Sequence, residues 1–166
     1  MQFGTTSLSE ASGITIESPG IYLIDTKEET AQRIIGTASN ATDFGIYRSA
    51  SDILYSKKYK KVYVLEEDTL EGIYGRDGHV SIFRVLKNRQ LEFVKRISPG
   101  GDEGMPSDFT VAHGGILTKR YLYVSSYASN YILKIHLKTD KVVKYWSSGD
   151  NGLNVPHGGF MSGHYR

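Results

Sequence analysis

Short runs of β-branched and aromatic residues recur along the whole chain, separated by polar or glycine-containing turns. Such runs are typical of β-strands, and helical periodicity is scarce. The one helix candidate, Thr26–Ile35, follows an apolar run directly and is explained equally well as a turn with a polar strand after it. The pattern predicts strands at Ile21–Asp25, Arg33–Gly36, Ile53–Tyr55, Lys61–Leu65, His79–Leu86, Glu92–Ile97, Gly115–Leu117, Tyr121–Ser125, Tyr131–His136 and Val142–Trp146.

The segment Tyr131–Leu137 shows the strand pattern most clearly. Its odd-numbered residues are all large and apolar or aromatic and share one face, whereas Ile132, Lys134 and His136 share the other. This period of two predicts a half-buried antiparallel strand. The polar segment Leu137–Lys141 then predicts a hairpin turn into the next strand.

An internal repeat indicates the architecture. His113–Leu122 aligns with His157–Arg166, and both segments contain His-Gly-Gly, two large apolar residues and a tyrosine at a spacing of 44 residues. This spacing suits a β-propeller blade of four antiparallel strands, whose repeats run ~40–50 residues. A generic β-meander is the alternative interpretation. The sequence therefore predicts an all-β fold built from propeller blades.

The length bears on how many blades are present. The chain has 166 residues, or roughly 3.8 blades, whereas propellers close with ~4–8. We expect a single partial β-propeller domain with blades at residues 14–60, 61–112 and 113–156 and a truncated blade at 157–166. A blade cut in this way leaves an open edge, through which copies of the chain can associate.

Composition and charge exclude several classes of protein. The chain has no cysteine, which excludes disulfides and thiolate chemistry, and its formal net charge of +2 gives no reason to expect a nucleic-acid partner. No apolar run approaches the ~18 residues of a membrane-spanning helix. The first ten residues lack the basic and apolar regions of a secretory signal. We therefore expect a cytoplasmic protein with no nucleic-acid or membrane partner.

Five motifs occur in a fixed order: Gly20–Thr26, Lys61–Glu67, Gly78–Val85, Tyr121–Ser129 and Val155–Phe160. In this order they resemble the lactonase family of seven-bladed β-propellers, which includes bacterial 6-phosphogluconolactonases and fungal carboxymuconate-lactonizing enzymes. The resemblance implies the N-terminal half of such a propeller. It also implies a sugar or muconate lactone as the small-molecule substrate, with hydrolysis or cycloisomerisation as the reaction.

The chain departs from the family pattern at three places. Ser126 and Glu66 each stand where the family usually has asparagine, and the start of the fourth blade has only His157 where two histidines are common. In the family this histidine is proposed to act on the substrate together with Arg and Glu from later blades. The resemblance therefore implies that His157 is the catalytic residue of this chain.

The residues themselves point to the same region. His113 and His157 each stand beside Gly-Gly at the start of a blade, where the first strand lines the central channel of a propeller, so both can face one ligand. Glu67 follows the strand Lys61–Leu65, and Tyr127 lies in the polar loop Ser125–Asn130. Together with His113 they are the candidate substrate-binding residues. The alternatives are a tight structural strand for the histidines, a solvated loop for the carboxylates and turn chemistry for Ser125–Asn130.

Other kinds of site have no support in the sequence. A metal site would need more ligands than two histidines, so we expect no metal and no cofactor. The chain has no G-x-S-x-G and no H-E-x-x-H motif, and Gly100–Gly104 lacks the Lys-Ser/Thr of a phosphate loop. The basic run Lys57–Lys61 is interpreted as a hairpin tip. Two functions stay open: a lactonase-like enzyme, and a non-catalytic β-propeller that serves as a binding or scaffold module.

Overall fold

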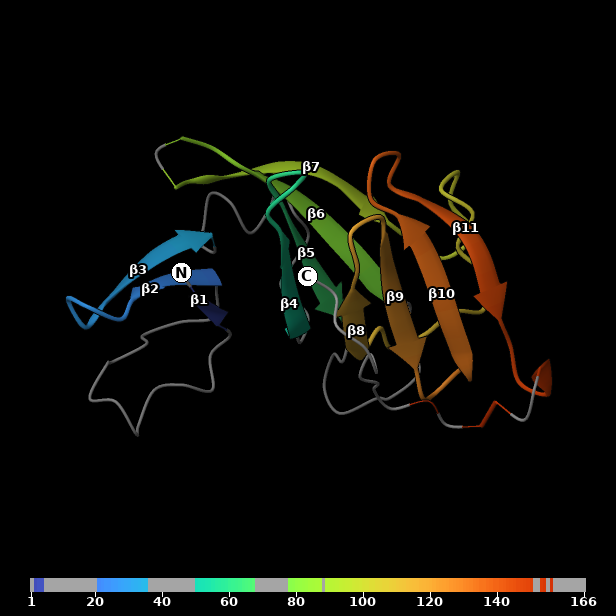
Figure 1. Cartoon of the computed structure of the whole chain (residues 1–166). Helices are drawn as coiled ribbons and strands as arrows, with labels where there is room; N and C mark the ends of the chain where they lie inside the picture. The colour runs from blue at the N-terminus through green and yellow to red at the C-terminus, as the bar shows by residue number, and fades with distance from the viewer. Residues whose placement is uncertain are drawn as a thin grey trace. The chain divides into compact units, whose positions relative to one another are not determined.

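The computed structural model describes residues 2–4, 21–35, 50–67, 78–87, 89–150, 153–154 and 156. In this part of the chain the fold is all-β: the strands form three antiparallel sheets, and no α-helix occurs (Figure 1). The chain divides into two compact units. Unit 1 comprises Met1–Tyr47 with Leu86–Leu91, and unit 2 comprises Arg48–Val85 with Glu92–Arg166.

Each sheet is a meander whose strands are adjacent in both sequence and space. The first sheet, in unit 1, has the order β1-β2-β3, with β1 at Gln2–Gly4, β2 at Ile21–Asp25 and β3 at Thr30–Ile35. The second has the order β4-β5-β6-β7, with β4 at Ala50–Ser56, β5 at Lys61–Glu66, β6 at His79–Val85 and β7 at Leu91–Ile97. The third has the order β11-β10-β9-β8, with β8 at Gly114–Leu117, β9 at Tyr121–Ser126, β10 at Tyr131–His136 and β11 at Lys141–Trp146.

The all-β prediction is confirmed, and every predicted strand overlaps an observed one. For Thr26–Ile35 the turn followed by a strand is correct, because β3 begins at Thr30. Strand β1 was not predicted. Residues Ser56 and Lys61 pair across the β4–β5 hairpin, so both strands belong to one sheet, and the expected division between residues 60 and 61 falls inside this hairpin.

Four hairpins share one turn geometry. Each has a four-residue turn whose last residue adopts a left-handed conformation: Glu29 (φ 50°), Lys60 (φ 52°), Asn130 (φ 57°) and Asp140 (φ 53°). At the β2–β3 turn the Asp25 carboxylate accepts hydrogen bonds from two backbone N–H groups of the turn, at 3.0 and 3.3 Å. These bonds hold the pKa of Asp25 below its ordinary value, because they stabilise the charged form.

The main core of unit 2 lies between its two four-stranded sheets. From the second sheet, alternate residues of β5 and β6 enter this core, and from the third sheet alternate residues of β9 and β10 do so. The first strands of the two sheets, β4 and β8, also lie next to each other (Figure 1). The fully buried members include Tyr63, Leu65, Val80, Ile82, Leu122, Val124, Leu133 and Ile135.

A buried polar cluster ties these two sheets together at one edge of the core. The Lys61 ammonium of β5 forms an ion pair with the Asp140 carboxylate of the β10–β11 turn. The Tyr63 hydroxyl donates to Asp140 Oδ1 at 3.2 Å and to the Leu137 carbonyl at 3.3 Å. Burial and the neighbouring Asp140 carboxylate both raise the pKa of Tyr63, since each disfavours a phenolate.

The raised pKa of Tyr63 predicts a loss of stability in alkali. The folded-state pKa lies above the unfolded value of about 10, so the stabilising contribution is complete below pH 10 and is lost as the pH rises above it. We expect the free energy of unfolding of wild type to fall more steeply above pH 10 than that of Tyr63→Phe. Urea denaturation at a series of pH values measures this difference. Parallel pH profiles for the two proteins would contradict the prediction.

Candidate functional site

His113 stands immediately before β8 in the third sheet. Its backbone N–H donates to the Ser125 carbonyl at 3.0 Å, which continues the β8–β9 pairing by one residue. Two residues earlier, Val111 is fully buried and has a φ of 51°, a conformation that β-branched residues rarely adopt. The chain therefore reaches His113 through a strained turn held by the surrounding core.

Side chains of β4 hold the start of β8 in place. The Ser51 hydroxyl donates to the Ala112 carbonyl at 2.6 Å, and the Asp52 carboxylate accepts a hydrogen bond from the Gly115 N–H at 3.1 Å. A Cβ atom at Gly115 would lie 2.7 Å from a methyl group of Leu54, so glycine permits the close approach of the two strands. These contacts fix the backbone on either side of His113.

Two consecutive glutamates at the end of β5 have different partners. The Glu67 carboxylate contacts His113 Nδ1. The preceding Glu66 is buried and receives the Arg96 guanidinium, with a shortest distance of 3.0 Å, while Arg96 Nε donates to the Ser81 hydroxyl at 3.1 Å. Successive side chains of a strand point to opposite faces, so Glu66 and Glu67 reach different partners although they are adjacent in the sequence. The expected alternative of a solvated loop does not hold for either glutamate, since the Glu67 side chain is only 15% exposed.

Tyr127 completes the cluster from the β9–β10 turn. Its ring meets the His113 ring edge to face, with the centroids 5.1 Å apart. The turn is held by hydroxyl groups: the Ser126 hydroxyl donates to the Thr110 carbonyl, and Ser129 Oγ accepts a hydrogen bond from the Thr110 N–H at 3.0 Å. The turn chemistry expected for Ser125–Asn130 is thus present beside the aromatic contact.

The contact with Glu67 orients the His113 ring, with Nδ1 facing the carboxylate. In the tautomer that has its proton on Nδ1, this nitrogen donates to an ionised carboxylate and Nε2 carries the lone pair. The His113 side chain is 33% exposed, so solvent and small molecules can reach it. An oriented, accessible imidazole of this kind can accept a proton or bind a polar ligand.

The structure brings together three of the four residues that the sequence singled out: His113, Glu67 and Tyr127. His157 lies outside the described residues. Sequence reasoning missed the pairing of Glu66 with Arg96. The strand alternation of β5 would have indicated that Glu66 and Glu67 diverge, but nothing in the local sequence indicates the arginine.

In the part of the chain that the structure describes, no group of three or more His, Asp or Glu side chains is placed so that it could hold a metal ion. That part also contains no helix with the length and apolar character needed to cross a bilayer.

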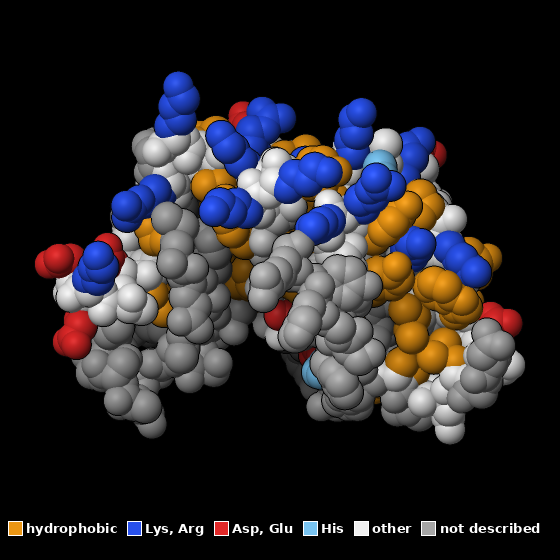
Figure 2. Space-filling model, viewed as in Figure 1, with side chains coloured by type: hydrophobic (Ala, Val, Ile, Leu, Met, Phe, Trp, Pro, Cys, Tyr) orange, Lys and Arg blue, Asp and Glu red, His pale blue; other side chains and the backbone are white. Residues whose placement is uncertain are grey.

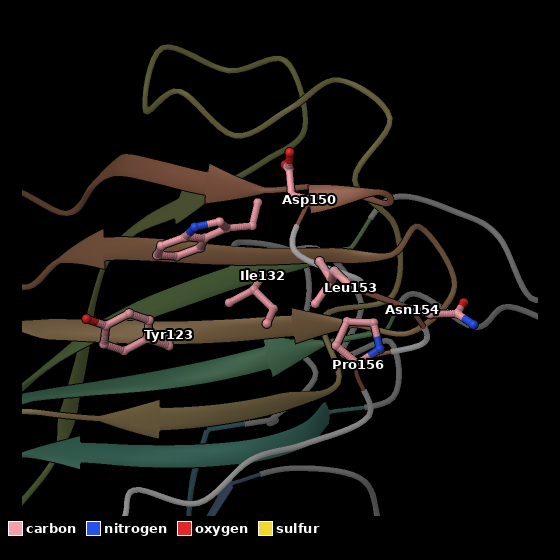
Figure 3. Close-up of a pocket in the computed structure, with 7 residues that line it drawn as sticks. Tyr123, Ile132, Asp150, Leu153, Asn154 and Pro156 are labelled. Atoms are coloured by element: carbon pink, nitrogen blue, oxygen red, sulfur yellow. The ribbon is translucent and has the colours of Figure 1, made fainter.

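A cavity of about 560 Å³ lies on the third sheet, and His113 is not among the residues that line it. Tyr123, Ile132 and Trp146 line it from β9, β10 and β11, and the following segment adds Leu153 and Pro156 (Figure 3). The cavity is mainly apolar. The Asp150 carboxylate at its rim accepts hydrogen bonds from the backbone and hydroxyl of Ser147, so it serves the local turn.

No family model matches this chain, and no curated protein matches it either. The resemblance to lactonase propellers therefore rests on the order of the sequence motifs.

Proposed function

We propose that the sheets are blades of a lactonase-like β-propeller, and that His113, Glu67 and Tyr127 form part of its substrate site. Two observations support the arrangement: both sheets of unit 2 are four-stranded meanders, and their first strands lie side by side, as inner strands do around a propeller axis. The substrate is a sugar or muconate lactone. His157, the second histidine with Gly-Gly, is assigned to the same site.

The contact between Glu67 and His113 carries the proposed chemistry. With Nδ1–H directed at Glu67, Nε2 takes a proton from water as the water oxygen bonds to the lactone carbonyl carbon. The bond from this carbon to the ring oxygen then breaks, and the proton passes to the ring oxygen to give a hydroxy acid. Glu67 stabilises the imidazolium that forms between these steps, and Tyr127 borders the ring of the substrate.

Hydrolysis of 6-phosphogluconolactone by the full chain tests this proposal, with proton release followed in a pH-stat. We expect turnover above the buffer rate. His113→Asn is expected to lower kcat/KM by about 10²-fold or more, because the proton acceptor is lost. Glu67→Gln is expected to lower it by roughly tenfold or more, because the amide neither fixes the tautomer nor stabilises the imidazolium.

His136→Asn is the matched control, since His136 lies on the same sheet and its Nδ1 contacts only a threonine hydroxyl, that of Thr139, at 3.2 Å. We expect its kcat/KM to equal that of wild type. The absence of turnover with this lactone and with muconolactone would contradict the enzymatic proposal, as would an equal loss of activity in His136→Asn and His113→Asn.

A non-catalytic binding or scaffold module is the second candidate. It is favoured by the fact that Glu67 follows a strand of the second sheet and His113 precedes a strand of the third, so their contact also joins the two sheets. In this case His113→Asn would lower the free energy of unfolding while wild type turned over no lactone. The two measurements together separate the candidates.

A further inference from the structure

In unit 2, polar side chains of the second sheet bind a hairpin turn of the third sheet. The third residue of β5, Tyr63, and the nearby Lys61 ammonium both bind Asp140, the last residue of the β10–β11 turn. A tyrosine hydroxyl and an ammonium group on one sheet thus receive a carboxylate from a hairpin turn of the neighbouring sheet.

The outer face of the third sheet carries the same two kinds of group, with the ammonium placed over tyrosine rings. Its second strand, β9, also has a tyrosine as third residue, Tyr123, which is only partly buried. Tyr121 stands at the position of Lys61, and the Lys134 ammonium lies 4.0 Å from the centre of its ring and 5.8 Å from that of Tyr123. Tyrosine rings and an ammonium group therefore lie together on this sheet as well, on the face that carries the cavity lined by Tyr123 and Trp146 (Figure 3).

This face is basic as well as aromatic. Strands β9, β10 and β11 contain lysines and a histidine but no aspartate or glutamate. Lys144 adds a second ammonium group, 4.8 Å from the ring of Trp146. Figure 2 shows hydrophobic side chains interspersed with basic ones over this sheet. The surface therefore fits an occupant that brings a carboxylate together with apolar surface.

Unit 1 also has a hairpin turn whose last residue is acidic, like the turn that carries Asp140. Glu29 is the last residue of the β2–β3 turn, the place that Asp140 has in the β10–β11 turn, and the two have φ values of 50° and 53°. Glu29 is exposed, whereas Asp140 is buried against Lys61. The described part of the chain thus has two hairpin turns that end in an acidic residue with this geometry. Asp140 is bound between the second and third sheets, whereas Glu29 is exposed.

We propose that a second copy of this chain docks on the outer face of the third sheet and places its Glu29 against Lys134 and Tyr123. The contact is heterologous, so it joins copies head to tail and closes into a ring when the rotation permits. This inference builds on the propeller arrangement proposed above, in which the three described sheets of each of two copies make six, within the ~4–8 blades of closed propellers.

The molar mass of the full chain in solution tests this proposal, measured by size-exclusion chromatography with light scattering over a range of concentrations. We expect wild type to have at least twice the mass of one chain. Lys134→Glu and Glu29→Lys are each expected to raise the dissociation constant by roughly tenfold or more, since like charges then face each other. Lysine is acceptable at residue 29, because Lys60 holds the same turn position with a φ of 52°.

Charge-matched controls separate this contact from a general effect of charge. Glu28→Lys changes the neighbouring residue of the same turn, and Lys138→Glu changes an exposed lysine of the β10–β11 turn. Both are expected to keep the mass of wild type. The double variant Lys134→Glu/Glu29→Lys restores opposite charges and is expected to regain association, and circular dichroism checks that every variant is folded.

A monomeric wild type at all concentrations would overturn the proposal. So would equal weakening by Glu28→Lys and Glu29→Lys, or a failure of the double variant to regain association. Binding of a single-stranded oligonucleotide to wild type that Lys134→Glu abolishes, without association of the chain, would assign the face to nucleic acid instead. Mass is measured without substrate, so this result stands apart from the lactonase assay.

Discussion

Replacing Lys61 with methionine will lower the free energy of unfolding by about 3–5 kcal/mol, because it leaves the Asp140 carboxylate buried without its cation. The Asp140 side chain is 7% exposed and that of Lys61 16%, so water cannot replace the lost partner. Methionine keeps most of the side-chain volume. The decrease in the free energy of unfolding therefore comes mainly from the unpaired Asp140 charge. Urea denaturation with linear extrapolation measures this decrease.

Two further variants isolate the charge. Lys58→Met removes an exposed lysine from the turn of the same hairpin and is expected to change the free energy of unfolding by less than about 0.5 kcal/mol. The double variant Lys61→Met/Asp140→Asn is expected to recover much of the loss. Asparagine tolerates the left-handed turn position and still accepts a hydrogen bond from the Tyr63 hydroxyl. Wild-type stability in Lys61→Met would contradict the account.

Local pattern was enough to predict most of the strands. In β10 the alternation of apolar and polar residues over Tyr131–Leu137 gave both the strand and its buried face: Leu133 and Ile135 are fully buried, while Lys134 is not. Such alternation arises because successive side chains point to opposite faces, a property of the strand itself. Strand β1, Gln2–Gly4, is too short to show any period, and its place depends on its pairing with β2.

The partners of the polar residues could not be predicted in the same way. Lys61 and Asp140 are separated by 79 residues, and His113 and Glu67 by 46. Each contact depends on how the second and third sheets pack, which no local period encodes. The sequence predicts Lys61 both as the last residue of the basic turn and as the first residue of a strand. The structure has it as the first residue of β5, where its side chain reaches the next sheet.

The candidate site was predictable because its three members end or begin strands. Glu67 follows β5, His113 precedes β8 and Tyr127 follows β9, so each lies where a meander places the ends of neighbouring strands together. The orientation of the His113 ring could not be predicted, because it depends on a carboxylate that follows a strand of another sheet. The backbone strain at Val111, two residues before the histidine, was equally invisible in a run of ordinary residues.

Replacing Gly78 with alanine is expected to lower the free energy of unfolding by about 3 kcal/mol or more, because the new methyl group has no space. A Cβ atom at this position would lie 2.6 Å from the backbone nitrogens of Val111 and Ala112. The backbone at Val111 cannot easily move away from the new methyl group, because Val111 is already in a strained conformation. A shift there would also displace His113, which is two residues further along the chain. Urea denaturation measures the loss, which is expected to be accompanied by weakened lactone turnover.

Gly115→Ala is the comparison variant: it also replaces a glycine, but its new methyl group meets a side chain and not the backbone. Its Cβ atom would lie 2.7 Å from Leu54 Cδ1, the end of a flexible side chain that can rotate away, so we expect a loss nearer to ~1 kcal/mol. Shortening the obstacle in Gly115→Ala/Leu54→Val is expected to restore part of the stability. Gly78→Ala has no comparable rescue, because its obstacle is main chain. Equal losses in Gly78→Ala and Gly115→Ala would show that the segment before His113 yields as readily as a leucine side chain.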